Sequence, residues 1–399
     1  MTMDKSFSTR VLHEGDASYA KKVAGMASIP ETFPIYQTSV FAFDNIADVD
    51  AIYEKEADGY IYSRLASPNA DAVSQMLAAA DGGENALVFA SGMAAITTTI
   101  LSFVGKGDHI ISSPVLYGGV QDFLSNELAR FGVEVTFAEI LDGNITPHIR
   151  PNTKLVYTET ICNPLMEVPD LEAVAKTAHD HGLKVLVDNT FATPMIAQPI
   201  KMGVDAVLYS ATKYLGGHSD IIAGAVVGSD EIIARVKRFQ ILYGSILSPH
   251  DCWLLARSLR TLELRMQRHS KNAQEVACFL EAHDKIDKVF YPGLVSSPSH
   301  ERARRLFENG LFGGMLSVDL KGGEAAAETL IRELEMILLV PSLAGTATTL
   351  SWSARTSHRF YSPEERLKIG ITDGQLRFSI GLEDVRDLIA EISHALEKI

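Results

Sequence analysis

The sequence predicts an α/β fold with a mostly parallel central sheet and a smaller α+β domain at the C-terminal end. The chain has 399 residues, enough for about two domains. Apolar runs of strand length alternate with helical segments up to about residue 250, where the alternation stops. Strands that are apolar throughout are typical of parallel sheets covered on both faces by helices. We therefore expect an N-terminal arm over 1–65, a large domain over 66–250 and a C-terminal domain over 251–399.

The first 65 residues show weak periodicity and contain turn dipeptides such as Ile29-Pro30 and Phe33-Pro34. Proline fixes φ and disfavours a helical conformation in the residue before it. We expect this segment to be an extended arm. The N-terminus also lacks the apolar core of a signal peptide, so the expected location is the cytoplasm.

Seven apolar runs in the large domain are predicted strands, with helical patterns such as 121–131 and 170–181 between them. The runs are ALVFA (86–90), HIISS (109–113), VEVTF (133–137), KLVYT (154–158), KVLVD (184–188), AVLYS (206–210) and IAGAVVG (222–228). The uncharged stretch Ala86–Gly105 is about as long as a membrane span. Its Ser91-Gly92 step and three successive threonines predict a buried strand, a turn and a buried helix instead.

Residues 248–283 form one long helical pattern, and Ser248-Pro249 is a typical helix start. We expect this helix to connect the two domains. The predicted elements after it are a strand at 313–320, a helix at 324–336, a strand at 337–340 and a final helix at about 383–398.

The composition excludes several classes of partner. The net charge is −14, from 36 basic and 50 acidic side chains. Nucleic acid and anionic membranes require clustered Lys and Arg, so neither is expected to bind. Cys162, Cys252 and Cys278 lie far apart and form no CxxC pattern. This spacing disfavours a disulfide framework or a zinc site, and no metal is expected.

Polar and small residues stand at or just after the ends of five predicted strands. Ligands of open α/β sheets bind beyond the carboxyl ends of the strands, so these residues should face one crevice. They are Ser91-Gly92-Met93, Leu116-Tyr117-Gly118-Gly119, Cys162-Asn163-Pro164, Asp188-Asn189-Thr190 and Ser210-Ala211-Thr212-Lys213.

Taken singly, these residues allow more than one interpretation. The Gly92 segment could be a tight turn or a phosphate site at a helix N-terminus. Asp188 could cap the next element, although a buried carboxylate without a cation is costly. Tyr117 could belong to the core or could stack on a flat ring. Lys213 could lie on the surface or could bind phosphate.

Taken together, the residues match the needs of pyridoxal 5′-phosphate (PLP). This cofactor requires an acid at its ring nitrogen, an aromatic stack, a phosphate cradle of hydroxyls and amides, and a lysine amine for its aldehyde. We expect Lys213 to hold the aldehyde covalently and, once displaced by the substrate amine, to move protons.

The segment DAVLYSATKYLGGHSD (205–220) resembles the lysine signature of the Cys/Met-metabolism family of PLP enzymes. The similarity spans nearly the whole chain. Its other blocks are PIYQTSVFAFD (34–44), GYIYSRLASPN (59–69), ASGMAA (90–95), LYGG (116–119), DNTFATP (188–194), LSPHD (247–251), LRTLELRMQRH (259–269) and LRFSIGLED (376–384). The resemblance implies PLP-dependent fold type I, which is similar to aspartate aminotransferase. It also implies a homotetramer built from dimers that share active sites.

The resemblance assigns roles to individual positions. In cofactor binding, it implies that Lys213 carries PLP, Asp188 pairs with the ring nitrogen and Asn163 lies near the 3′-oxygen. Tyr117 would stack on the ring and assist leaving-group departure. The implied phosphate ligands are Gly92, Met93, Ser210 and Thr212, with Tyr62 and Arg64 reaching into the neighbouring subunit's site. Arg377, with Ser342, would clamp the substrate α-carboxylate, a task suited to a planar guanidinium.

The resemblance favours a γ-lyase, similar to methionine or cystathionine γ-lyase. Such an enzyme removes the γ-substituent of a homocysteine- or homoserine-derived amino acid and releases 2-oxobutyrate and ammonia. The alternatives are γ-replacement, as in O-acylhomoserine sulfhydrylases and cystathionine γ-synthases, or elimination of a non-sulfur group. These alternatives stay open because the distal pocket departs from both lyases. The departures are Gly119 for a cysteine, Gln240-Ile241 for a Lys-Asp pair, Pro341 for a glutamate and Ala344 for a glycine.

Overall fold

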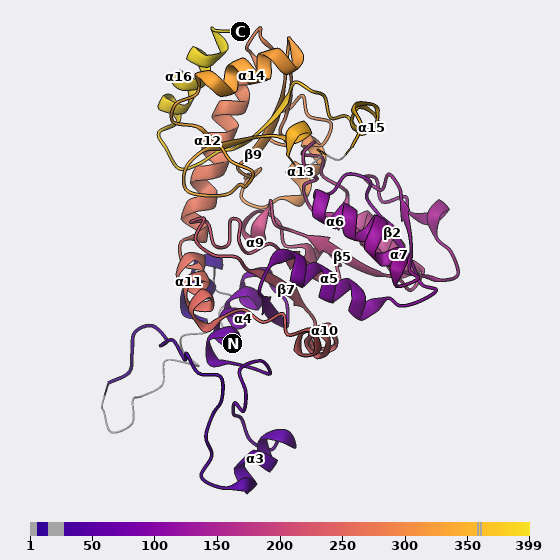
Figure 1. The fold of residues 1–399 in the computed structure, drawn as a ribbon, viewed down its shortest axis with the longest axis vertical. Helices are drawn as coiled ribbons and strands as arrows, with labels where there is room; N and C mark the ends of the chain where they lie inside the picture. The colour runs from indigo at the N-terminus through magenta and orange to yellow at the C-terminus, as the bar shows by residue number, and fades with distance from the viewer. Residues whose placement is uncertain (1–5, 15–27, 357–358, 360) are drawn as a thin grey trace.

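The computed structural model describes residues 6–14, 28–356, 359 and 361–399. Figure 1 shows three tiers along the long axis of the molecule: an N-terminal segment at the bottom, a body around one sheet in the middle, and a C-terminal part around a second sheet at the top. No helix in the described ranges is long and apolar enough to cross a bilayer.

A seven-stranded sheet forms the middle tier, in the order β1-β7-β6-β5-β4-β2-β3. Its strands are β1 (Asn85–Phe89), β2 (His109–Ser112), β3 (Glu134–Phe137), β4 (Thr153–Glu159), β5 (Lys184–Asp188), β6 (Ala206–Tyr209) and β7 (Gly224–Gly228). The β2–β3, β2–β4, β4–β5 and β5–β6 pairs are parallel, whereas β7 is antiparallel to β1 and β6. The prediction of a mostly parallel sheet is confirmed, and the predicted strands match within two residues at each end.

Both faces of this sheet are covered, which explains why its strands are apolar throughout. In β1, Leu87 and Phe89 pack into one buried cluster, and Ala86 and Val88 pack into another. Helices α5 (Gly92–Phe103) and α10 (Asp230–Tyr243) cover the first face, and α4 (Pro68–Asp81) and α8 (Leu171–Asp180) cover the second. The stretch Ala86–Gly105 is therefore a strand, a turn and a helix, as expected.

The second sheet has five strands in the order β10-β11-β12-β9-β8. They are β8 (Ile286–Phe290), β9 (Met315–Leu320), β10 (Leu338–Leu339), β11 (Thr349–Trp352) and β12 (Gln375–Ser379). Helices α12 (Leu262–Glu281), α14 (Gly323–Glu333) and α16 (Val385–Leu396) cover one face, and Leu376 and Phe378 of β12 join them in the core. Because side chains alternate along a strand, Arg377 points to the opposite face. That face looks toward the seven-stranded sheet.

The single helix expected over 248–283 is wrong in one respect. The chain forms α11 (Pro249–Leu259) and then α12, with a break at residues 260–261. The Ser258 carbonyl at the break accepts from Thr261 N at 3.1 Å and from Arg265 Nη2 at 2.9 Å. These bonds replace the helical partner that the carbonyl lacks, so the chain can turn there without leaving a buried acceptor unpaired.

Shorter elements complete the described structure. They are α1 (Phe7–His13), α3 (Ile46–Tyr53), α6 (Gly118–Asp122), a π-helical turn at Phe123–Glu127, α7 (Leu128–Arg130), α9 (Thr193–Ile196), α13 (His300–Leu306), α15 (Pro363–Lys368) and 3₁₀ turns at Thr146–His148, Pro199–Met202 and Ser353–Arg355.

The N-terminal segment agrees only partly with an extended arm. Residues 28–45 are mostly irregular, and α3 stands away from the body (Figure 1). In contrast, α1 packs on α4, where Val11 is buried. The arm expected over 1–65 also includes residues 1–5 and 15–27, which lie outside the described part of the chain.

Candidate active site

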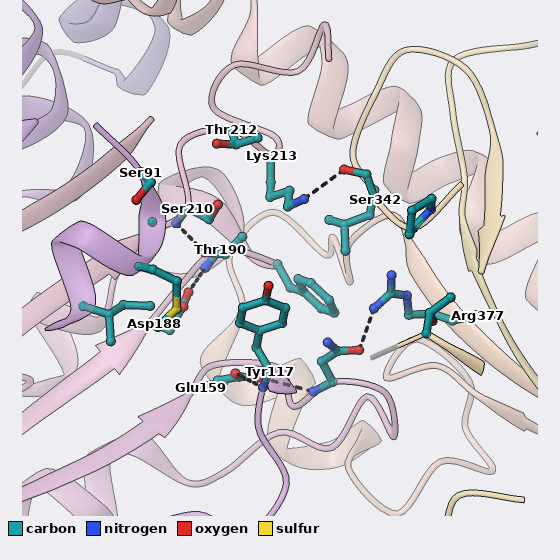
Figure 2. A pocket seen from close by; sticks show the side chains of 18 of the residues that line it. Ser91, Tyr117, Glu159, Asp188, Thr190, Ser210, Thr212, Lys213, Ser342 and Arg377 are labelled. Atoms are coloured by element: carbon teal, nitrogen blue, oxygen red, sulfur yellow. Dashed lines mark hydrogen bonds between the residues drawn. The ribbon is translucent and has the colours of Figure 1, made fainter. Parts of the chain in front are cut away.

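A cavity of 640 Å³ lies between the two sheets. The middle tier lines it with residues at the carboxyl ends of β4, β5 and β6 and at the start of α5. The C-terminal tier lines it with Arg377 of β12, the segment 341–343 and three residues after β11. Figure 2 shows that Tyr117, Asp188, Lys213, Ser342 and Arg377 gather around this space. The crevice expected at the strand ends therefore exists, and its second wall comes from the C-terminal sheet.

The N-terminus of α5 forms one end of the cavity. Ser91 caps the helix by accepting a hydrogen bond from Ala94 N at 3.1 Å, and Ser91, Gly92 and Met93 line the cavity. A Cβ at position 92 would lie 2.7 Å from the Cβ of Ser210, so glycine is needed for the two segments to approach this closely. The hydroxyl of Ser210 and the positive end of α5 thus meet at a place suited to a phosphate.

Thr212 also lines the cavity, but its hydroxyl already has partners. It donates to Ala223 O at 3.2 Å and accepts from Ala223 N at 2.9 Å. To donate to a phosphate, this hydroxyl would have to give up its hydrogen bond to Ala223 O. The geometry therefore supports Ser210 more directly than Thr212 as a phosphate ligand.

Asp188 ends β5 at the floor of the cavity and is only 8% exposed. Its Oδ1 accepts from Thr190 N at 2.9 Å, and burial raises the pKa of the carboxyl to about 6. No Lys or Arg in the described ranges forms a salt bridge with it. A buried carboxylate in this state is stabilised by a cation, which the protonated ring nitrogen of PLP would supply.

Lys213 reaches the cavity from the turn after β6. Its Nζ donates to Ser342 Oγ at 2.9 Å, and burial, followed by the charge of Arg377, lowers its pKa (Figure 2). A lowered pKa increases the neutral amine fraction, which is the form that attacks an aldehyde. The carbonyl of the next residue, Tyr214, accepts from the buried Arg265 at 2.6 Å, which ties this turn to α12.

Tyr117 stands at the start of α6, with its ring pointing into the cavity in Figure 2. Gly119 leaves room for that ring, because a Cβ at position 119 would lie 2.7 Å from Tyr117 Cε1. The ring lines the same cavity as Asp188, and its stacking on a flat ligand stays a prediction.

Arg377 provides the cation on the opposite wall. It is 6% exposed, and its Nη1 donates to Asn163 Oδ1 at 2.8 Å. Burial lowers its pKa to about 10, so the guanidinium remains charged at neutral pH. Its Nε is buried with no hydrogen-bond partner in the described structure. An unsatisfied, charged donor beside a cavity is suited to bind a carboxylate.

Tyr62 and Arg64 do not reach this cavity within their own chain. Arg64 Nη1 donates to Ile241 O at 2.8 Å, and its guanidinium carbon lies 5.8 Å from the centre of the Tyr62 ring. Both belong to the N-terminal segment. Their expected place in a neighbouring subunit's site stays a prediction.

Sequence reasoning missed several residues of the cavity. Glu159, at the end of β4, accepts from Tyr117 N at 2.7 Å, and a carboxylate directly after a predicted strand could have indicated it. Arg355 and Arg359 follow β11, and no strand-end pattern marked them. Among the described residues, no group of three His, Cys, Asp or Glu side chains is arranged to hold a metal.

Comparisons with known proteins agree with this geometry. The model of the family described as Cys/Met metabolism PLP-dependent enzyme matches residues 10–397. An L-methionine gamma-lyase from Porphyromonas gingivalis is 42% identical over 100% of this chain and 98% of its own length. A cystathionine gamma-lyase from Bacillus subtilis is 38% identical over 98% of this chain and 99% of its own.

A solved structure leads to the same assignment. The crystal structure of metB from Corynebacterium glutamicum has a TM-score of 0.90 and 36% identity, covering 99% of this chain and 98% of that one. The predictions of PLP as cofactor, of fold type I and of a γ-lyase are confirmed. The chain belongs to the Cys/Met metabolism family of PLP-dependent enzymes.

Proposed function

We propose that the enzyme eliminates the γ-substituent of a homocysteine- or homoserine-derived amino acid and releases 2-oxobutyrate and ammonia. The observation that carries this proposal is the convergence of three groups on one cavity. Lys213 offers an amine, Asp188 a buried acid, and Arg377 a buried, partly unsatisfied guanidinium. Together they match an amino-acid substrate held over a PLP ring.

Bound PLP supplies an electron-accepting ring that stabilises negative charge at the α-carbon of the substrate. The residues of the chain position and transfer protons around it. Asp188 keeps the ring nitrogen protonated, and Arg377 holds the α-carboxylate. Lys213 would hold the PLP aldehyde, and its Nζ would take the α-proton of the substrate. Tyr117, which lines the same cavity, would cover the ring and assist the departing group.

Phosphate binding is assigned to Gly92 and Met93 at the start of α5, and to Ser210 and Thr212 after β6. We assign Asn163 to the 3′-oxygen, since its amide already orients Arg377 on the same wall. Ser342 supports Lys213 now and would join Arg377 at the α-carboxylate once the lysine is bound to cofactor.

We also propose that the enzyme is a cytoplasmic homotetramer whose dimers share active sites. Exposed apolar side chains on the arm, such as Val40 at 57% and Ile46 at 72%, are suited to a subunit contact. Tyr62 and Arg64 would then meet the neighbouring subunit's phosphate. An Arg64→Ala variant should bind PLP more weakly by equilibrium titration. Unchanged cofactor retention would refute the shared site.

A second candidate is supported by Arg355 and Arg359, which line the outer part of the cavity. Both arginines are exposed, and Arg355 pairs with Glu324 and lies 5.3 Å from the Trp352 ring centre. Two guanidinium groups at this place favour a γ-substituent that ends in an acid, such as O-succinylhomoserine, as the substrate of elimination or of γ-replacement by a thiol.

A substrate panel tests both candidates. Purified holoenzyme is mixed with methionine, cystathionine, homocysteine, O-acetylhomoserine or O-succinylhomoserine, with and without added thiol. Elimination predicts 2-oxobutyrate and ammonia in equal amounts without thiol. Strong thioether formation with only weak oxoacid release would instead identify a γ-replacement enzyme.

A further inference from the structure

Glu159 is a buried carboxylate whose task is not explained by cofactor or substrate contacts. It ends β4, is 5% exposed, and lies opposite Asp188 of β5 in the parallel register. Two carboxylates at paired positions on one face repel each other when both are ionised. Burial, and next the charge of Asp188, raise the pKa of Glu159 to about 8. Burial of such a carboxyl group is unfavourable unless specific donors bind its oxygens.

Both oxygens of Glu159 are occupied by backbone donors. Oε1 accepts from Tyr117 N at 2.7 Å, and Oε2 accepts from Asn163 N at 3.2 Å (Figure 2). Asp188 differs, since its hydrogen bonds come from the backbone and side chain of one residue, Thr190. Glu159 is bound by two segments that lie far apart along the chain.

The two donors lead to opposite walls of the site. Tyr117 carries the ring that covers the cavity, and its backbone N lies where the chain enters α6. Asn163 carries the amide that accepts from Arg377 Nη1 at 2.8 Å. One carboxylate thus connects the stacking residue to the guanidinium on the C-terminal sheet through a single chain of hydrogen bonds.

We propose that Glu159 is a positioning residue that holds the Tyr117 ring over the cofactor site and, through Asn163, sets the Arg377 guanidinium for the substrate carboxylate. This inference rests on the proposed function, because it uses the roles assigned there to Tyr117 and Arg377. It adds a coupling between the two walls, because substrate binding at Arg377 depends on Glu159, which also positions Tyr117.

The carboxylate is hard to replace because it meets two N–H groups with two acceptor oxygens. A glutamine keeps the shape but has one oxygen, so its NH₂ group must face the N–H of either Tyr117 or Asn163. A buried N–H that loses its acceptor is costly because no water replaces the lost bond. Glu159→Gln should therefore disturb both walls.

The experiment uses the holoenzyme and L-norleucine, an amino acid of similar size that has no γ leaving group. Norleucine binding is followed through the visible absorbance of the bound cofactor. We expect E159Q to weaken norleucine binding about 10- to 100-fold, the range for a buried donor left without an acceptor. Glu167→Gln is the matched control: it lies in the segment after β4, carries the same charge change and does not line the cavity, so its dissociation constant should stay within about twofold of wild type.

A double-mutant cycle separates positioning from general damage. Asn163→Ala removes the amide that links Glu159 to Arg377. The fold loss of norleucine affinity caused by E159Q should therefore be at least about threefold smaller in N163A than in wild type. E159Q should also raise the dissociation constant of PLP, both in wild type and in N163A. Neither of these proteins lacks the hydrogen bond between Glu159 and Tyr117 N before E159Q is introduced. Unfolding temperatures confirm that the variants are folded.

Additive losses in the cycle, or wild-type norleucine affinity in E159Q, would overturn the inference. If E159Q does not fold, Glu159→Asp serves instead: it keeps the charge but withdraws both oxygens, and it should show the same non-additivity. Failure of the proposed function is visible separately, since wild-type holoenzyme would then give no 2-oxobutyrate with any member of the substrate panel.

Discussion

The two walls of the cavity are built in different ways. The wall from the seven-stranded sheet takes its residues from the carboxyl ends of parallel strands and from the turns that follow them, as with Asp188 at the end of β5 and Lys213 after β6. The wall from the five-stranded sheet takes Arg377 from the middle of an antiparallel strand. The first wall holds the groups suited to PLP, and the second holds the group suited to a substrate carboxylate.

This difference separates two kinds of positioning. Turn residues at strand ends are placed by the sheet itself, because parallel strands all end at one edge. Arg377 is placed by alternation, which sends Leu376 and Phe378 into the core and the arginine to the opposite face. A change confined to Arg377 should therefore leave the cofactor wall in place, because Glu159 keeps its bond to Tyr117 N.

The largest effect is expected on the cofactor wall. Lys213→Ala removes the amine that holds the aldehyde and takes the α-proton, so turnover should fall by at least about 10²–10⁴-fold. The visible absorbance that borohydride reduction removes should also be lost. Lys184→Ala, at an exposed lysine paired with Asp205, is the control and should keep both properties. Retention of that absorbance by K213A would place the attachment on another lysine.

The next effect is expected on the substrate wall. Arg377→Lys keeps a positive charge but loses the planar fork, so kcat/KM should fall about 30-fold or more, the loss typical of a disrupted buried charge pair. The absorbance of bound PLP should persist, because the other wall is intact. Steady-state kinetics and PLP titration measure the two properties side by side. Equal loss of both would mean that Arg377 is needed for cofactor binding as well as for substrate binding.

A smaller effect is expected where Tyr117 packs over the cavity. Gly119→Ala places a methyl group 2.7 Å from Tyr117 Cε1, so the ring must shift. The cost of such overpacking is about 1–3 kcal/mol, part of which should appear as weaker PLP binding in a titration. Gly105→Ala is a matched control, because nothing lies within 4 Å of the added Cβ. Wild-type affinity in G119A would show that the ring does not need this space.

The smallest effect concerns stability. Burial raises the pKa of Asp188 to about 6 and that of Glu159 to about 8, above their values in the unfolded chain. Between the unfolded and folded pKa values, the native apoenzyme binds more protons than the unfolded chain. Its unfolding free energy should therefore fall as pH rises, by on the order of 1 kcal/mol between pH 6 and pH 8.

Bound PLP should reduce this decline, because the ring-nitrogen cation beside Asp188 lowers the pKa of that carboxyl. Denaturant unfolding of apo- and holoenzyme at several pH values measures the difference. A steeper decline with PLP than without it would contradict the pairing of Asp188 with the ring nitrogen.

Much of the fold could be predicted from the sequence, and the misses have identifiable causes. The strands of the large sheet were recognisable because they are apolar on both faces. The break between α11 and α12 was not, because it depends on Arg265 bonding to Ser258 and Tyr214. A helical pattern in the sequence indicates which face of a helix is buried. It does not indicate where a side chain can donate to a backbone carbonyl that a break in the helix leaves unpaired.

The candidate site divides in the same way. Lys213, Asp188 and Tyr117 were predicted because a strand precedes each of them. Glu159 also follows a predicted strand, so its place could have been noticed, but its task could not. Its partners are backbone N–H groups, one of them 42 residues away along the chain, and any residue type supplies such a donor.

The sequence by itself determined the elements, the residues at the strand ends and the cofactor that those residues fit. These depend on local rules: side-chain alternation, helix capping and the common edge at which parallel strands end. Only the tertiary structure decided that Glu159 serves the backbone while Asp188 faces the cavity, and that Arg377 lies opposite Lys213. Those outcomes depend on distances between segments far apart in the chain, where hydrogen bonds of about 3 Å discriminate between otherwise equivalent side chains.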